Sequence, residues 1–183
     1  MITASEKKKE NIAEYLLYMW QIEDLIRAFD LDIDKIKANI IDRYTGLSDS
    51  TRKEMTEWYE SLIDMMRREE VTKSGHIQLN KNVILALTDL HNRLMQDSRF
   101  ADYNAEYYKT LPYIVEIRSK AGENKKGEIE SCFDALYGTL LLRLQKKEIS
   151  KDTEAAVKQI SAFLSKLSGY YKKDYNNELF ADN

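Results

Sequence analysis

Apolar side chains recur every three or four positions along most of this chain, and this spacing constrains the fold more than any other feature. The cleanest stripe consists of Ile129, Cys132, Phe133, Leu136, Tyr137, Leu140, Leu141 and Leu144. Such a repeat places apolar side chains on one face of an α-helix, where other helices can shield them from water. Only one proline and six glycines occur among the 183 residues, so few positions interrupt long helices. The sequence therefore predicts an all-α fold.

Seven helices are expected from the periodicity and from the residues that typically begin and end helices. Their approximate bounds are 5–29, 32–44, 51–70, 81–96, 101–120, 128–147 and, starting at 150 or 152, past 167 towards 171. Pro112 lacks a backbone donor and its ring clashes with the preceding turn, so we expect a kink or break near Thr110. The segment 71–79 is interpreted as a loop, with a short β-hairpin as the alternative.

These helices predict a single-domain antiparallel bundle of six or seven helices over residues 1–183. An internal repeat is the alternative, because Met55–Met66 aligns without gaps to Phe133–Leu144. Residues 32–97 and 99–172 would then be two related three-helix units. Any two amphipathic helix pairs align in this way, and two copies are too few for a solenoid. We therefore favour one undivided domain.

The charge balance and the cysteine content narrow the functional classes. The formal net charge is −3, from 28 basic and 31 acidic residues that are interspersed, whereas nucleic-acid binders usually carry a basic stripe. No stretch approaches the roughly 20 apolar residues that a membrane-spanning helix needs. Cys132 is the only cysteine, which rules out an intrachain disulfide and suits a reducing compartment. We expect a cytoplasmic protein that contacts neither nucleic acid nor membrane.

Signatures of metal, cofactor or catalytic chemistry are missing from the sequence. Residues 30–34 begin like a calcium loop, but Lys35 and Ile41 stand where that loop needs glycine and glutamate; we expect the aspartates to cap a helix instead. His76 and His91 lack the spacing of zinc or di-iron ligands, and no glycine-rich phosphate loop occurs. The sequence predicts no metal and no cofactor, and it favours a protein without catalytic activity.

Three residues of the first helix and one histidine are the candidate binding residues. Trp20, Glu23 and Arg27 lie along one edge of the apolar stripe, and the spacing of Glu23 and Arg27 predicts an intrahelical ion pair. If other helices enclose this pair, it would hold a ligand. If it lies on the surface, it would be an ordinary ion pair that contributes at most ~1 kcal/mol to stability. We favour the surface ion pair. His91 is expected to be a half-buried core histidine and is the fourth candidate. His76 follows Gly75 in a loop, and no neighbouring nucleophile supports a role for it.

Two tyrosine clusters, at 103–113 and 170–175, are typical of core edges and of interfaces. Our leading hypothesis is therefore an interaction or regulatory protein that binds a protein partner, or a second copy of itself, through a helical face or groove. The alternative is a small-molecule-binding protein or enzyme with a pocket between helices. In that case Trp20, Glu23, Arg27 and His91 would contribute to the pocket.

Two segments resemble a known family. They are residues 10–27, ENIAEYLLYMWQIEDLIR, and residues 75–82, GHIQLNKN, which are followed by LTDLH at 87–91. Both are similar to segments of an uncharacterised all-helical family, a domain of unknown function, from Bacteroidetes-type gut bacteria. The resemblance extends over nearly the whole chain. It implies an all-helical fold and a bacterial cytosolic location, and it transfers no catalytic residue.

Overall fold

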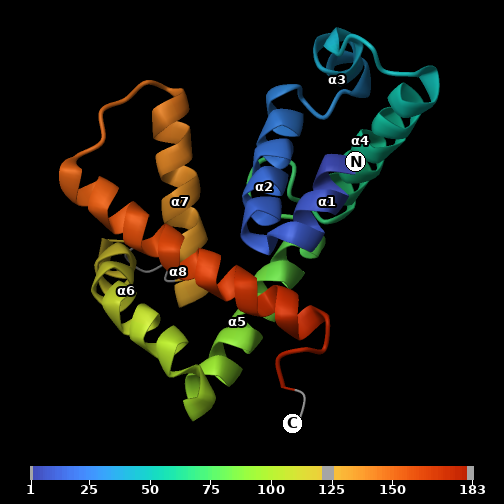
Figure 1. The fold of residues 1–183 in the computed structure, drawn as a ribbon. Coiled ribbons are helices and arrows are strands. Elements are labelled where there is room, and N and C mark those ends of the chain that lie inside the picture. Colours follow the sequence, from blue (N-terminus) through green and yellow to red (C-terminus); the bar gives the residue numbers. More distant parts are fainter. Residues whose placement is uncertain (1, 121–125, 181–183) are drawn as a thin grey trace. The chain divides into compact units, whose positions relative to one another are not determined.

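A computed structural model describes residues 2–120 and 126–180. Within these ranges the chain forms α-helices and two short 3-10 helices, η1 and η2, and no strand (Figure 1). The helices are α1 (Ile2–Glu10), α2 (Ile12–Ala28), α3 (Ile33–Asn39), η1 (Ile41–Arg43), α4 (Asp49–Arg68), α5 (Gln78–Gln96), η2 (Ser98–Phe100), α6 (Ala101–Lys120), α7 (Glu128–Leu144) and α8 (Lys151–Tyr175). The predicted all-α class is confirmed. In the described part, none of these helices combines the length and apolarity needed to cross a bilayer.

The chain divides into two compact units. Unit 1 comprises residues 1–10 and 14–82, and unit 2 comprises residues 11–13 and 83–183. Unit 1 therefore holds α1, nearly all of α2, α3, α4 and the start of α5, whereas unit 2 holds the rest of α5 and α6 to α8. The predicted single domain and the alternative repeat at 32–97 and 99–172 stay predictions.

The expected first and second helices are each interrupted at a point where a side chain bonds to the backbone. The helix expected at 5–29 divides at Asn11, whose Oδ1 accepts the Ala13 N–H at 3.1 Å and so caps α2. The helix expected at 32–44 ends as α3 at Asn39 and continues as η1. There the Arg52 guanidinium of α4 donates to the carbonyls of Ile41, at 3.0 Å, and Tyr44, at 2.7 Å. These bonds satisfy carbonyls that a continuing helix would have used itself.

Serines begin two of the longer helices. The Ser48 side chain accepts the Thr51 N–H at 3.2 Å, so α4 starts before the predicted position at Thr51. Ser150 caps α8 in the same way, by accepting the Thr153 N–H, which agrees with the predicted start at 150. The 71–77 segment is a loop, as predicted. Gly122 and Gly127 also predict a linker at 122–127, and most of that segment lies outside the described residues.

Pro112 does not end its helix. The α-helix runs through it from Ala101 to Lys120, so the expected break near Thr110 does not occur, whereas the alternative, a kink, stays a prediction. The carbonyl that loses its partner belongs to Tyr108, four residues earlier. The Tyr108 side chain is 62% exposed, and on this open side of the helix water can take the place of the missing N–H.

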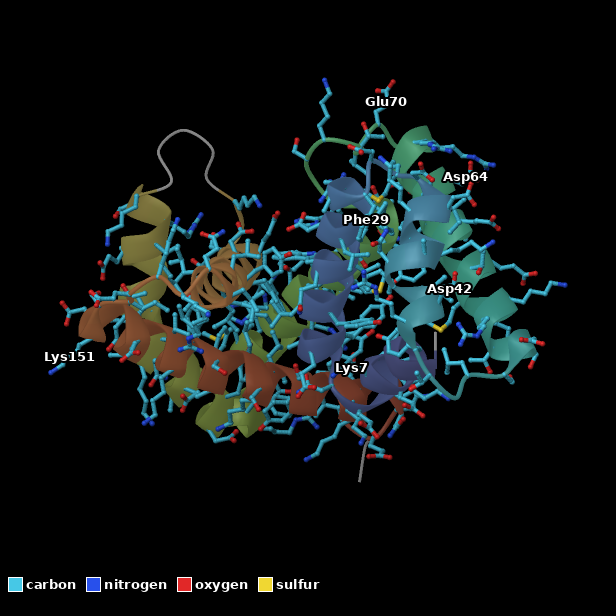
Figure 2. All side chains as sticks on the ribbon, turned by 90° about the horizontal axis from the view of Figure 1, so that it is seen from above. Lys7, Phe29, Asp42, Asp64, Glu70 and Lys151 are labelled. Atoms are coloured by element: carbon cyan, nitrogen blue, oxygen red, sulfur yellow. The ribbon has the colours of Figure 1, made fainter. Side chains whose placement is uncertain are left out.

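Each unit has an apolar core, and charged side chains such as Asp42, Asp64 and Glu70 lie on the exposed surface (Figure 2). Unit 1 buries Leu16, Met19, Ile26, Ile36, Leu62, Met66 and Ile77. In unit 2, where α6, α7 and α8 pack on one another, the buried set includes Leu90, Leu94, Tyr103, Ile114, Phe133, Phe163 and Leu167.

The apolar stripe of α7 is buried only in its first half. Phe133 is fully buried, whereas Leu136 and Leu140 are partly exposed and Leu144 is 66% exposed. The expectation that the whole stripe faces a core is therefore wrong for its C-terminal end. Leu144 is the last residue of α7, and beyond Phe133 the neighbouring helices no longer cover all of that face.

Candidate functional site

Glu23 of α2 is the centre of a buried polar cluster in unit 1. Its side chain is 1% exposed. One carboxylate oxygen, Oε1, accepts the Ile77 N–H at 2.9 Å and the Asn80 side-chain amide at 2.8 Å. The other, Oε2, lies 2.5 Å from Nδ1 of His76. All three partners come from the end of the 71–77 loop and the first turn of α5, so the carboxylate also occupies the positive end of that helix.

Trp20 and His76 complete this cluster. Their rings are stacked in parallel, with centroids 4.1 Å apart and planes 10° apart. Trp20 is 1% exposed, whereas the His76 side chain is 20% exposed. Because Glu23 fixes one edge of the imidazole and Trp20 covers one face, the ring has a defined orientation.

Arg27 does not pair with Glu23, so that predicted ion pair is wrong. Its guanidinium binds Asp24 at 2.8 Å and donates to the carbonyls of Val71, at 3.1 Å, and Gly75. Gly75 has a positive φ of +85°, which folds the loop back so that these carbonyls face α2. Glu23 reaches the start of α5 while Arg27, one turn further on, reaches the loop carbonyls, and the two side chains bind different parts of one segment.

This arrangement fastens the 71–80 segment to α2. Hydrogen bonds to charged groups contribute about 1.5–3 kcal/mol each. No hydroxyl or thiol of the described residues bonds to the His76 ring, so the geometry offers an oriented imidazole without a nucleophile. His76 and Asn80 could not be predicted as partners of Glu23, because no helical spacing rule connects residues 53 and 57 positions apart. Their only sequence signal was their place in the 75–82 segment.

His91 belongs to unit 2, and its partners differ from those of the other three candidates. Its Nδ1 lies 2.7 Å from the Tyr103 hydroxyl, and its ring contacts Tyr107 and Phe163 at centroid distances of 4.9 and 6.0 Å. It is 7% exposed, more buried than expected, and this burial lowers its pKa below the ordinary value. His91 also lines a cavity of about 330 Å³.

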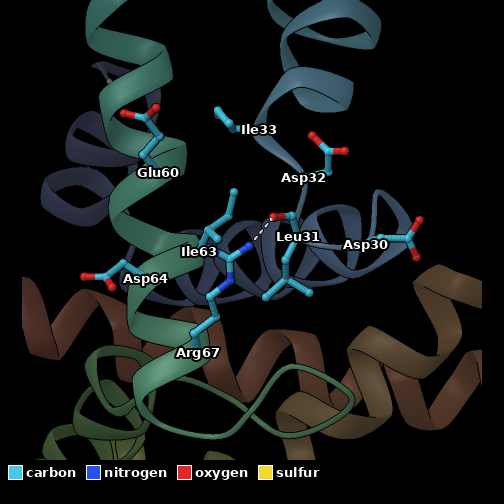
Figure 3. Close-up of a pocket in the computed structure, with 8 residues that line it drawn as sticks. All are labelled: Asp30, Leu31, Asp32, Ile33, Glu60, Ile63, Asp64 and Arg67. Carbon is cyan, nitrogen blue, oxygen red and sulfur yellow. Dashed lines mark hydrogen bonds between the residues drawn. The ribbon is translucent and has the colours of Figure 1, made fainter.

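A cavity of about 500 Å³ in unit 1 lies between α4 and the turn that joins α2 to α3 (Figure 3). Arg67 crosses it to donate to the Leu31 carbonyl at 3.0 Å. Asp32 accepts from the backbone of Asp34 and Lys35, which confirms that it caps α3. Although four carboxylates line this cavity, no three His, Cys, Asp or Glu side chains of the described residues come close enough to hold a metal ion.

The largest of these hollows is a groove of about 700 Å³ in unit 2, lined by α6, α7 and α8, which we call the α6–α8 groove. Its surface includes Ala135, Gly138, Leu142, Ala155, Ala156, Val157 and Ile160. A Cβ added to Gly138 would meet no atom within 4 Å. None of the four predicted binding residues lines this groove. Its only sequence signal was the run of small residues at helical spacing.

Comparison with known proteins identifies the chain by family alone. No curated protein and no solved structure matches it. The predicted membership of an uncharacterised family is confirmed, while the bacterial origin stays a prediction. Residues 1–178 match the family described as Domain of unknown function (DUF4924), and the chain belongs to that family.

Proposed function

We propose that this protein is a cytoplasmic, non-catalytic interaction module that binds an amphipathic helix of a partner protein in the α6–α8 groove. The observation that carries the proposal is the open groove around Gly138, where an added Cβ would meet no atom of a neighbouring element within 4 Å. Helix-in-groove recognition needs an apolar channel between helices that is wide enough for the side chains of one helical face.

The composition of the groove suits a guest helix. Gly138 and the alanines at 135, 155 and 156 keep the floor shallow, so the backbone of a guest could approach closely. Leu142 and Val157 are partly exposed and supply apolar surface, whose burial contributes roughly 25 cal/mol per Å². The partner helix would therefore present small and aliphatic side chains at positions i, i+3, i+4 and i+7.

Charge at the rim selects among such helices. The lining contains three carboxylates, of Glu116, Asp134 and Asp152, and one ammonium group, of Lys120. Lys120 already binds Glu116 at 2.6 Å, and Lys126 binds Asp134 at 2.9 Å. Asp152 has no ion-pair partner in the described part of the chain. The rim therefore favours lysine or arginine beside the apolar stripe of the partner.

The cytoplasmic location is supported by the single cysteine. Cys132 is buried in unit 2, and burial raises the pKa of its thiol to about 12. The side chain thus behaves as a small apolar core residue. The fold does not depend on a disulfide, which suits a reducing compartment.

The test compares the wild-type chain with Gly138→Trp and Gly169→Trp in quantitative affinity purification. Both glycines are inside helices and have free space around a Cβ, but only Gly138 lines the groove. We expect a stoichiometric partner with the wild-type and Gly169→Trp chains, and its loss with Gly138→Trp. Equal recovery by all three chains, or recovery by none, would contradict the proposal.

A further inference from the structure

A second cavity of unit 2 is separate from the α6–α8 groove and has the size and side chains of a small-molecule site. It measures about 330 Å³ and is lined by residues of α5, α6 and the start of α7, a size at the lower end of the roughly 300–1,000 Å³ that small-molecule sites occupy. Met95 and Ile129 form the apolar part of the wall, and Tyr107 contributes an aromatic ring. The polar lining residues are Thr88, His91, Asn92 and Glu128. Polar groups beside apolar and aromatic surface are what fixes the orientation of a small molecule in a ligand site.

The hydrogen bond between His91 and Tyr103 determines which nitrogen of the imidazole carries the proton. Tyr103 is fully buried, and burial raises the pKa of its hydroxyl, which therefore keeps its proton. That proton has only one acceptor within the described residues, Nδ1 of His91 at 2.7 Å. Because burial lowers the pKa of His91, the ring is neutral at pH 7 and its remaining proton is on Nε2.

The Nε2–H edge is the one that can face the cavity. Nδ1 is turned towards the buried Tyr103, and Nε2 is on the opposite edge of the same ring. Nε2 has no hydrogen-bond partner in the part of the chain that the structure describes. His91 Nε2 is not one of the fully buried polar atoms without a partner among the described residues, so this edge of the ring is accessible from the cavity. An acceptor on a bound ligand would replace water at this N–H.

Glu128 supplies a hydrogen-bond acceptor to the same cavity. Its Oε2 accepts the Tyr107 hydroxyl at 2.8 Å, and its Oε1 lies 3.3 Å from an Arg118 guanidinium nitrogen. These two bonds hold the carboxylate in place, and a carboxylate has room for further donors. The cavity thus presents a fixed N–H donor, a fixed carboxylate acceptor and an aromatic face.

We infer that this cavity binds a small planar heterocycle or aromatic amide that carries a carbonyl acceptor and an N–H donor. The carbonyl would accept from His91, the N–H would donate to Glu128, and the flat ring would lie against Tyr107 and Met95. An anionic ligand is disfavoured by the Glu128 carboxylate, and a hydrocarbon would leave the Nε2–H unbonded. The inference is independent of the α6–α8 groove.

The first test is NMR on the full chain with ¹⁵N-labelled histidine. We expect the His91 ring at pH 7 to show the neutral Nε2–H tautomer. Titration with uracil or nicotinamide should give saturable shifts at His91 and at the Ile129 methyl groups, whereas toluene and benzoate should give none. A charged ring, an Nδ1–H tautomer, toluene binding as tightly as the amides, or no saturable shift with either amide would each overturn the inference.

A matched pair of variants tests the acceptor. Glu128 and Glu130 both lie in the first turn of α7, but only Glu128 lines the cavity. Glu128→Gln should weaken binding of uracil roughly tenfold or more, because a hydrogen bond to a charged acceptor becomes a neutral one. Glu130→Gln should leave the affinity within about twofold. Equal affinities of the two variants would overturn the assignment of Glu128.

Discussion

The hydrogen bonds of Glu23 allow a quantitative prediction for Glu23→Gln. The substitution keeps the size of the side chain and leaves a neutral oxygen to accept from Ile77 and Asn80. Two charge-assisted bonds then become neutral ones, at a cost of about 1 kcal/mol each. The new NH₂ group replaces the oxygen that faces His76 Nδ1, so the third bond is lost or requires the other tautomer. We expect a total loss of about 2–4 kcal/mol in the free energy that holds the 71–80 segment.

Hydrogen exchange measures this loss where it occurs. Because the Ile77 N–H bonds directly to Glu23, its exchange should accelerate by roughly 30-fold to 1,000-fold, as each ~1.4 kcal/mol corresponds to a factor of ten. The control is Glu14→Gln, on the same helix with 59% of its side chain exposed, which should change stability by less than about 0.5 kcal/mol. If Glu23→Gln matched that control, the anchoring role of Glu23 would be wrong.

Three further predictions follow from the described geometry. The folded-state pKa of His91 is lowered by burial. Its contribution to stability is therefore complete above the unfolded pKa of about 6.5 and is lost as the pH falls from there through the folded pKa. An NMR titration should find that the His91 pKa is lower in the folded chain than in the urea-unfolded chain, and equal values would contradict this. Lys146 follows α7 with a left-handed φ of +56°, which is strained for lysine but not for glycine. Lys146→Gly should therefore raise the free energy of unfolding, measured by urea denaturation, by about 0.5–1 kcal/mol. A decrease would show that Lys146 does not adopt this conformation in solution. Cys132 should react with a thiol reagent at pH 8 far more slowly in buffer than in urea, and equal rates would show that the thiol is accessible in the folded state.

Most helices could be predicted from the sequence, because the spacing of apolar residues along a helix depends only on neighbouring positions. The stripe on α7 and the serine that caps α8 were readable from neighbouring residues alone. The division at Asn11 and the early end of α3 depended on single side-chain bonds, one of them from Arg52 in another helix. The break at Pro112 did not occur because the Tyr108 carbonyl, which loses its hydrogen bond, lies on an exposed side of the helix.

The candidate site was predictable only in part. Trp20 and Glu23 were singled out from their place beside an apolar stripe, and the structure brings them together with His76. The spacing rule that paired Glu23 with Arg27 failed because stronger partners, backbone groups of a loop some 50 positions away, compete for both side chains. The α6–α8 groove could not be predicted, because glycine and alanine occur at many helix positions. Such small residues leave a groove only where several helices pack around them.

Site-specific photo-crosslinking most directly tests whether the α6–α8 groove holds a partner helix. A benzophenone side chain would be placed at position 138 or, as the control, at position 169, and the chain would be expressed in its host cell. The account predicts that position 138 crosslinks to one protein, through a segment whose apolar stripe is flanked by lysine or arginine, and that position 169 does not. The same products from both positions, or no intermolecular product from position 138, would contradict it.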